Sequence, residues 1–229
     1  MKTIGLIGGI TWLSTVEYYQ LINQLVNQRA GGVSSAKLIV FSVDFSQIKT
    51  LTEAGDWESI AGIMGDAAEK LQTAGADCLL IGANTMHKIA DSIQQRVRIP
   101  VIHIASVTAD AIVEKGLRKV ALLGTKYVMQ MDFYTRKLAE KGIATLIPDE
   151  ASVSYINQAI YTEFGKGIFL PETKKRFLEI IDSLIDAGAE GVIFGCTEIP
   201  ILLKQEDCSL PVFDTTELHA RAAVNYAMT

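Results

Sequence analysis

The sequence predicts an α/β fold of two pseudo-symmetric Rossmann-like lobes, each with a small parallel sheet flanked by helices. Two observations support this prediction. Short apolar runs alternate with stretches that have helical spacing, and the second half of the chain repeats the pattern of the first. Strands that are apolar on both faces and separated by helices are typical of parallel sheets.

The first half contains three apolar runs of strand length, and helical patterns separate them. We expect strands in TIGLIGG, AKLIVFSVDF and DCLLIG, at residues 3–9, 36–45 and 77–82. Helices are expected over 14–29, where Val16, Tyr19, Ile22 and Val26 recur at helical spacing, and over 58–75. A further helix over 86–96 and a proline-led strand over 99–104 complete this half.

The second half follows the same order. RKVALLGT at 118–125 resembles the opening TIGLIGG, and AGADCLLIGANT at 74–85 aligns without a gap on AGAEGVIFGCTE at 187–198. A short helix, IPILLK, and a proline-led strand, LPVFDT at 210–215, come next. Two matched copies favour a duplication with two lobes over a solenoid, which needs more repeats.

The lobe boundary falls between the strand at 99–104 and the strand at 118–125. We therefore expect a first lobe over 1–104 and a second over 105–213. The last helix lies within 214–229 and is expected to pack back onto the first lobe.

The composition excludes several classes of partner. The net charge of −5 gives no basic surface for nucleic acid or an anionic membrane, and no apolar run is long enough for a membrane span. The start lacks the features of a signal peptide, and three cysteines, an odd number, give no disulfide framework. We therefore expect a cytoplasmic protein.

No cofactor is expected either. GLIGGITW and LLGTKY lack the spacing of a dinucleotide fingerprint, and there is no phosphate-binding GxxxxGK[ST] loop. His87, His103 and His219 are far apart in the sequence and lack metal-ligand spacing.

The repeat singles out Cys196, which aligns with Ala83. Both follow a strand-end glycine and precede a polar pair, so two facing lobes would place them across one cleft. Cys78 starts its strand, at the wrong end, and Cys208 lies in the polar segment KQEDCSLP. A free cysteine is often only a small buried hydrophobe, but a helix amino terminus favours a reactive thiolate. Both interpretations of Cys196 remain open on position alone.

The polar pairs after these positions have two compatible interpretations. Asn84 with Thr85, and Thr197 with Glu198, can cap the helices that follow, and a cap beside a cleft can also bind a carboxylate. Lys166, in the turn-like FGKGIF, is either a solvated charge or a partner for a substrate carboxylate.

At these motifs the chain resembles the aspartate/glutamate racemase family, which needs no pyridoxal phosphate. The resemblance covers nearly the whole chain, and it is carried by IGLIGGITWLST, SVDF, ANTMHK, ALLGTKY, GVIFGCTEIP and LPVFDT. It looks closest to bacterial enzymes with a broad range of acidic substrates. The resemblance implies two α/β lobes with the active site at their interface, a homodimer, and an acidic amino acid as the ligand.

The resemblance also implies a mechanism. One thiol removes the α-proton of the amino acid, and a second thiol delivers a proton to the opposite face. Cys196 matches one of these thiols. The resemblance assigns the remaining motif positions to substrate binding: Asn84, Thr85, Thr125, Thr197, Glu198, and Ile10 and Lys166 in loops that close over the substrate.

The sequence departs from the family pattern at the second thiol. The family places a cysteine at the position of Ala83 or one residue earlier, where this chain has Gly82. Neither residue carries a proton. We therefore expect an impaired or one-sided racemase. A non-catalytic protein that binds acidic amino acids and a single-cysteine decarboxylase of the same superfamily are the alternatives.

Overall fold

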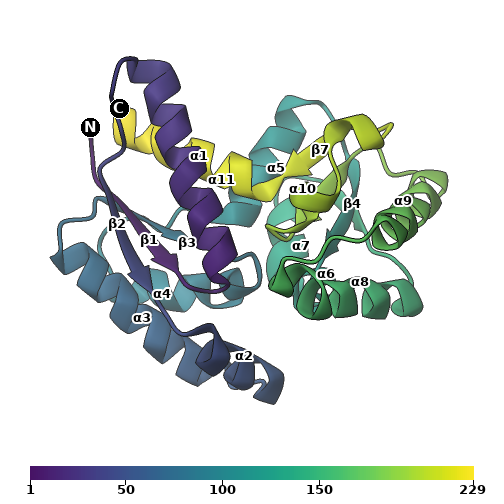
Figure 1. The fold of residues 1–229 in the computed structure, drawn as a ribbon, viewed down its shortest axis with the longest axis horizontal. Coiled ribbons are helices and arrows are strands. Elements are labelled where there is room, and N and C mark those ends of the chain that lie inside the picture. Colours follow the sequence, from purple (N-terminus) through teal and green to yellow (C-terminus); the bar gives the residue numbers. More distant parts are fainter. The chain divides into compact units, whose positions relative to one another are not determined.

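The computed structural model describes residues 1–229 and forms two compact units. Unit 1 contains residues 1–103 and 219–229, and unit 2 contains residues 104–218 (Figure 1). Residue 104 and residues 214–218 were expected in the first lobe, and by this division they lie in unit 2. The chain therefore passes between the units twice.

Unit 1 is built on a parallel sheet of three strands. Its order is β2 (Leu38–Ser42), β1 (Ile4–Gly8) and β3 (Cys78–Ile81). The expected strand over 99–104 is reduced to a single bridge between Val101 and Leu79. The helices of this unit are α1 (Trp12–Ala30), α2 (Phe45–Ala54), α3 (Trp57–Thr73), the 3-10 helix η1 (Thr85–Ile89), α4 (Ala90–Arg96) and most of α11 (Thr215–Met228).

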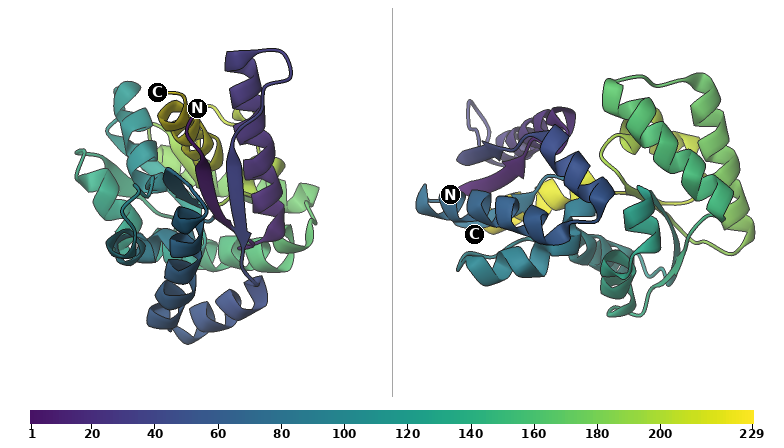
Figure 2. Two further views of the ribbon diagram at one scale, coloured as in Figure 1. Left: turned by 90° about the vertical axis from the view of Figure 1, so that its left-hand side faces the viewer. Right: turned by 90° about the horizontal axis from the view of Figure 1, so that it is seen from below.

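Helices cover both faces of the unit 1 sheet, as Figure 2 shows for α1 and α3. Successive strand side chains point to opposite faces. Leu6 therefore packs with Tyr18 of α1 and Val224 of α11, whereas Ile7 packs with Met64 of α3. The continuous apolar runs of the sequence follow from this double burial.

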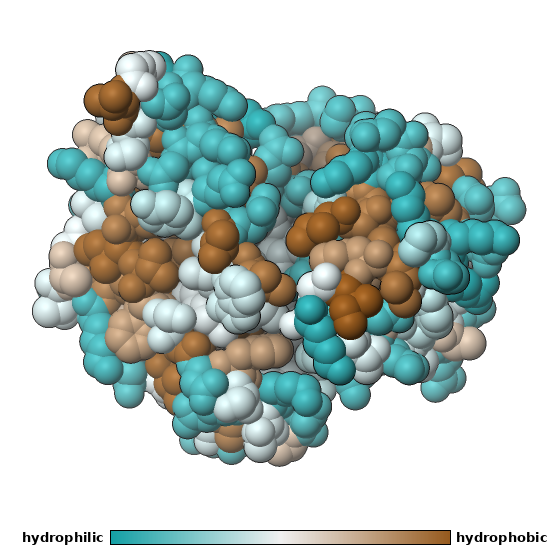
Figure 3. All heavy atoms as spheres, viewed as in Figure 1, coloured by the Kyte–Doolittle hydropathy of each residue, from teal (hydrophilic) through white to brown (hydrophobic).

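The buried face of α1 differs from the one that the spacing indicated. Ile22 and Val26 are buried as expected, together with Tyr18. Val16 and Tyr19 are instead 55% and 57% exposed. On the face of the molecule that Figure 3 shows, hydrophobic residues lie among polar ones. None of the helices is both long and apolar enough to cross a membrane.

Unit 2 is built on a parallel sheet of four strands. Its order is β5 (Ala144–Leu146), β4 (Lys119–Gly124), β6 (Val192–Gly195) and β7 (Val212–Asp214). The helices of this unit are α5 (Ile104–Glu114), α6 (Lys126–Gln130), α7 (Asp132–Ala139), α8 (Glu150–Thr162), η2 (Phe164–Lys166), α9 (Pro171–Asp186), α10 (Ile199–Leu202) and η3 (Gln205–Asp207).

The two sheets share a strand order, which confirms the predicted fold class. In each, the first strand of the unit is central, the next strand lies on one side, and the strand of the aligned repeat lies on the other. The Val101 bridge then takes the place that β7 fills in unit 2. The duplication seen in the sequence is thus matched by topology.

Candidate functional site

Chemically active side chains lie at the carboxyl ends of neighbouring strands in each unit. In unit 2 the last residues of β4 and β6, Gly124 and Gly195, are paired in the sheet. An added Cβ on either glycine would lie 2.8 Å from a carbonyl oxygen of the other strand, so the close approach requires glycine. Thr125 and Cys196 directly follow these two strands, so both lie at the same edge of the sheet, where the strands end.

Cys196 is bound to Glu198 across a tight turn. Its Sγ donates to Oε2 of Glu198 at 2.9 Å, and the hydroxyl of Thr197 donates to the same oxygen at 2.7 Å. Cys196 is 8% exposed and Glu198 is 4% exposed. These two hydrogen bonds stabilise the buried carboxylate, because a buried charge without hydrogen-bond partners is costly.

This arrangement corrects the thiolate interpretation of Cys196. Burial, and then the negative charge of Glu198, raise the pKa of the thiol well above its usual value. The helix that was expected to stabilise a thiolate, α10, has only four residues. Cys196 is therefore a protonated thiol with a proton acceptor beside it.

Thr125 and Lys166 are the remaining candidates of unit 2. Thr125 is buried, and its hydroxyl caps α6 by accepting from the backbone N–H of Val128 at 3.3 Å. Lys166 ends η2, directly before Gly167, and it is exposed. Thr125 is thus fixed at the strand edge, whereas Lys166 is on a surface turn.

In unit 1 the turn after β3 carries Ala83 and its polar neighbours. The backbone N–H of Gly82 donates to the carbonyl of Ile7 at 2.9 Å, and the hydroxyl of Ser14 donates to the carbonyl of Gly82 at 3.2 Å. An added Cβ at Gly82 would lie 3.1 Å from the Ile7 carbonyl oxygen. A side chain at position 82 would therefore press on this carbonyl, whereas Ala83 is partly exposed.

The predicted side-chain caps at these turns are wrong. Asn84 precedes η1 and Glu198 precedes α10, and neither side chain makes a capping bond. The helix expected from residue 86 starts as the 3-10 helix η1 at Thr85 and becomes α-helical only at Ala90. Asn84 and Thr85 are 4% and 8% exposed.

Ile10 follows β1 in an unusual loop. Its side chain is 6% exposed and packs in the hydrophobic core of unit 1 with Ile7 and Ile48. Gly9 has a φ of 83°, and Thr11, which is not a glycine, has a φ of 30°. Non-glycine residues with positive φ cost free energy and are common beside functional sites. Any contact of Ile10 with a ligand would therefore be made by its backbone.

The three histidines are not scattered in the structure. The ring centroids of His87 and His103 lie 4.9 Å apart, and those of His87 and His219 lie 5.4 Å apart. No group of histidine, cysteine and acidic side chains is placed to hold a metal ion. No local pattern in the sequence indicates this cluster, because the three residues come from distant segments.

Comparison with known proteins decides the family. The sequence profile of the Asp/Glu/Hydantoin racemase family matches residues 7–223 of this chain, which spans both units. The chain belongs to this family.

Solved structures and a characterised relative agree with this membership. A candidate Asp/Glu racemase from Yersinia pestis is 44% identical, with a TM-score of 0.94, and the match covers 100% of both chains. An aspartate racemase homologue from Pyrococcus horikoshii OT3 is 36% identical, with a TM-score of 0.87 and the same coverage. The broad-specificity amino-acid racemase of Bacillus subtilis is 25% identical over 70% of this chain and 69% of its own length.

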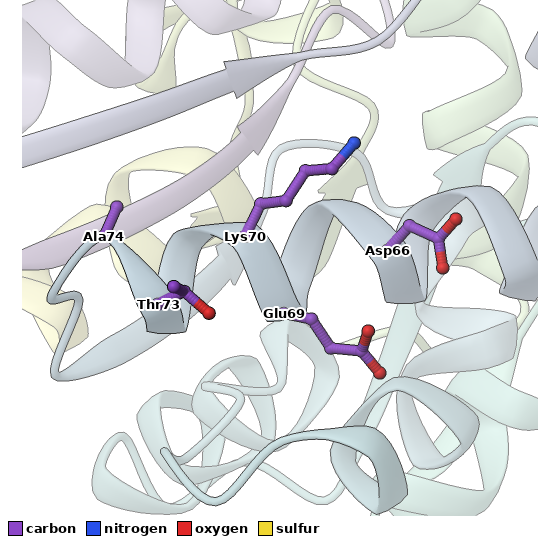
Figure 4. A pocket seen from close by; sticks show the side chains of 5 residues that line it. All are labelled: Asp66, Glu69, Lys70, Thr73 and Ala74. Atoms are coloured by element: carbon purple, nitrogen blue, oxygen red, sulfur yellow. The ribbon is translucent and has the colours of Figure 1, made fainter.

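A surface hollow of about 470 Å³ lies elsewhere on this racemase family member. Five residues of α3 and the turn after it line the hollow, namely Asp66, Glu69, Lys70, Thr73 and Ala74 (Figure 4). Asp66 and Glu69 are paired with Arg96 at 2.5 and 2.8 Å. None of the lining residues matches a motif position of the racemase family, so the hollow adds nothing to the candidate site.

Proposed function

We propose that the chain acts on aspartate or glutamate without a cofactor, by thiol-mediated transfer of the α-proton. The observation that carries this proposal is the 2.9 Å contact between the Cys196 thiol and the Glu198 carboxylate at the end of β6. Family membership and the activities named for its relatives support the substrate class.

The proton steps follow from the protonated thiol. Glu198 takes the Sγ proton of Cys196, and the resulting thiolate removes the α-proton of the L-enantiomer. A planar carbanion remains. Return of a proton from the same sulfur restores the L-enantiomer, and exchange of that proton with water in between labels the α-position. Glu198 thus acts as a general base through the thiol.

Binding and charge stabilisation fall to the polar groups at the strand edges. The α-proton is weakly acidic, so the carbanion needs preorganised donors in a water-poor site. Asn84 and Thr85 of unit 1 and Thr125, Thr197 and Lys166 of unit 2 are the proposed donors. The proposal for each of these residues rests on the matched positions that they hold after equivalent strands.

Inversion needs a second acid on the opposite face. In the repeat that position is Ala83, whose methyl group carries no exchangeable proton. We therefore propose a one-sided enzyme that exchanges the α-hydrogen of L-substrates, whereas net racemisation is very slow.

Solvent-deuterium incorporation tests this function. L- and D-aspartate, and L- and D-glutamate, are incubated separately with the protein in D₂O, and the α-position is followed by NMR. Exchange of an L-enantiomer that is lost in Cys196→Ser supports the proposal. Equal exchange of both enantiomers, or exchange that survives Cys196→Ser, contradicts it.

Ala83 also fits two other functions, a non-catalytic binding protein and a decarboxylase. Two further measurements distinguish them from the proposed enzyme. Thermal stabilisation by aspartate without any isotope exchange would identify a non-catalytic binding protein. Release of carbon dioxide from an arylmalonate would identify a single-cysteine decarboxylase. The polar residues Asn84, Thr85 and Thr197 disfavour the decarboxylase, because such enzymes use an apolar pocket.

We also propose that the protein is a homodimer, as the family resemblance implies. Helix α1 supports this with Trp12, Val16 and Tyr19, which are 68%, 55% and 57% exposed on one uncharged helix face. An apolar face without charges pairs with a copy of itself without desolvating ions. Light scattering should give twice the chain mass, and Val16→Lys should give the monomer. A monomeric parent protein would refute the dimer.

A further inference from the structure

The histidine cluster of unit 1 has an assignable hydrogen-bonding pattern. The Nε2 of His219 lies 2.6 Å from the carbonyl oxygen of Ile102, and its Nδ1 lies 2.8 Å from the hydroxyl of Tyr18. A carbonyl oxygen only accepts, so Nε2 carries the hydrogen and Nδ1 accepts from the tyrosine. His219 is thereby fixed at both nitrogens, and its ring packs against the ring of His87.

The tautomer of His87 follows in the same way. Its Nδ1 lies 3.0 Å from the carbonyl oxygen of Ala83, so Nδ1 carries the hydrogen and donates. Its Nε2 is buried and has no hydrogen-bond partner. The ring is 2% exposed. Burial, and then the neighbouring His103, lower the pKa of His87 to about 3. The imidazole is therefore neutral, and its single N–H is already in use.

The acceptor of this bond lies in the turn that carries position 83. The bond from His87 to Ala83 spans four residues and closes over Asn84 and Thr85. On the strand side, the hydroxyl of Ser14 donates to the carbonyl of the preceding residue, Gly82, at 3.2 Å. Two consecutive carbonyls of the turn are thus held by side chains from two different helices.

We propose that His87 is a positioning residue, which fixes the backbone of the turn at Ala83, Asn84 and Thr85 while His103 and His219 hold its ring. This inference rests on the proposed function for its meaning in catalysis. His87 transfers no proton, because its only N–H is bonded to Ala83 and its Nε2 has no hydrogen. Its effect is confined to groups that depend on the unit 1 turn.

The test uses the two faces of the substrate. In an Ala83→Cys background, residue 83 supplies a thiol for one enantiomer, and Cys196 of unit 2 serves the other. His87→Phe fills the space without a donor. His87→Asn retains an N–H near the place of Nδ1. We expect His87→Phe to slow α-exchange of D-aspartate at least roughly 10-fold more than that of L-aspartate. The turn carries the thiol for the D-enantiomer but only binding groups for the L-enantiomer, and a misplacement of about 1 Å can lower a rate by about 100-fold.

The His87→Asn variant distinguishes a positioning role of His87 from a role in folding. His87→Asn should exchange D-aspartate within roughly 3-fold of the Ala83→Cys background, because its amide keeps the bond to residue 83. An equal loss for both enantiomers in His87→Phe, in step with a lower folded fraction, would show a merely structural role and overturn the proposal. Unchanged exchange in His87→Phe would overturn it as well.

A ligand-free measurement keeps the inference independent of catalysis. Amide hydrogen exchange over residues 82–87 of the otherwise unmodified chain should speed up in His87→Phe and stay near the parent rate in His87→Asn. Equal protection in all three proteins refutes the positioning role. Failure of the proposed function appears differently, as a lack of L-aspartate exchange in the parent protein, where His87 is intact.

Discussion

The Sγ atom of Cys196 lies 2.9 Å from Oε2 of Glu198, and one residue separates the two in the turn after β6. The carboxylate both holds the thiol proton and, by its charge, raises the pKa of the thiol beyond the effect of burial. The same group therefore keeps the sulfur unreactive at rest and offers a destination for its proton. Removing that charge should raise the reactivity of the sulfur toward alkylation and lower its activity in α-exchange, two properties that usually change together.

Glu198→Gln should make Cys196 easier to alkylate and worse at catalysis. Loss of the carboxylate charge lowers the thiol pKa, so more thiolate is present at a given pH and iodoacetamide reacts faster. Loss of the proton acceptor should slow α-exchange of L-aspartate on the order of 100-fold. Peptide mapping measures alkylation, and NMR measures exchange.

Cys78 serves as the internal control for that experiment. It is fully buried in β3, and burial, with a smaller effect of Asp77, raises its pKa to about 12. Its alkylation should not change in Glu198→Gln. Faster alkylation of both cysteines would mean that the variant has unfolded, and slower alkylation of Cys196 would contradict the assigned effect of the carboxylate.

A cysteine at position 83 should restore racemisation, and a cysteine at position 82 should not. The side chain of Ala83 is partly exposed, whereas a Cβ on Gly82 would press on the Ile7 carbonyl at 3.1 Å. Ala83→Cys is expected to raise the rate of net racemisation of aspartate at least roughly 10-fold. Gly82→Cys should destabilise the fold by about 1–3 kcal/mol.

Circular dichroism measures the rate of racemisation, and urea unfolding measures the stability of the two cysteine variants. Ala83→Ser is the matched control for size, because its hydroxyl fills nearly the same space but is a far weaker acid. Racemisation by Gly82→Cys at the rate of Ala83→Cys would show that the backbone at Gly82 yields, and the steric argument would then be wrong.

The buried histidines should make the fold sensitive to mild acid. Burial is the main cause that lowers the pKa of both His87 and His219 to about 3, whereas the unfolded value is about 6.5. Between these values the unfolded state binds more protons, so stability is lost as the pH falls below about 6.5. From about pH 7.5 to about pH 5.5 the free energy of unfolding should fall by about 1.4 kcal/mol per histidine.

Urea unfolding at the two pH values measures this loss. His87→Asn removes one of the two titrating rings and should reduce the pH dependence by about half. The paired carboxylates with a lowered pKa, such as Asp207 and Asp149, titrate below this window and do not contribute. A stability that is constant between the two pH values would contradict neutral, buried rings.

Thr125→Ala should affect both stability and activity. Its hydroxyl caps α6, and loss of such a cap costs about 1 kcal/mol. Asp56→Ala removes the cap of α3, which accepts from Ser59 at 3.0 Å, and should cost a similar amount. Only Thr125→Ala should also weaken substrate binding. An equal effect of both variants on the KM for α-exchange would remove Thr125 from the site.

Much of the fold could be predicted because the strands are buried on both faces. Runs such as CLLI and VIFG are apolar at every position, and the aligned repeat places them in equivalent strands. The buried face of α1 could not be predicted in this way. Both of its faces carry large apolar residues, so Val16 and Tyr19 fit the helical period as well as Tyr18 does.

The sequence indicates where the candidate residues lie along the strands, and it does not indicate how they interact. The positions of Cys196 and Ala83 follow from strand ends, which periodicity shows. The bond to Glu198 depends on how sharply residues 196–198 turn, and the role of His87 depends on a 3-10 helix and on two distant histidines. Most of helix α11 lies in unit 1, and with it His219, but nothing in the local sequence indicated the neighbours of this histidine.

The position of α11 at the end of the chain also determines when the core of unit 1 can form during synthesis. Ala223, Val224 and Ala227 complete the core cluster around Leu6 and Tyr18, yet a ribosome makes them more than a hundred residues after His103. All of unit 2 has been synthesised before this cluster can close. During translation the part of this sheet face beside α1 that α11 will cover therefore stays exposed in the nascent first half, and this is the surface that a chaperone would shield.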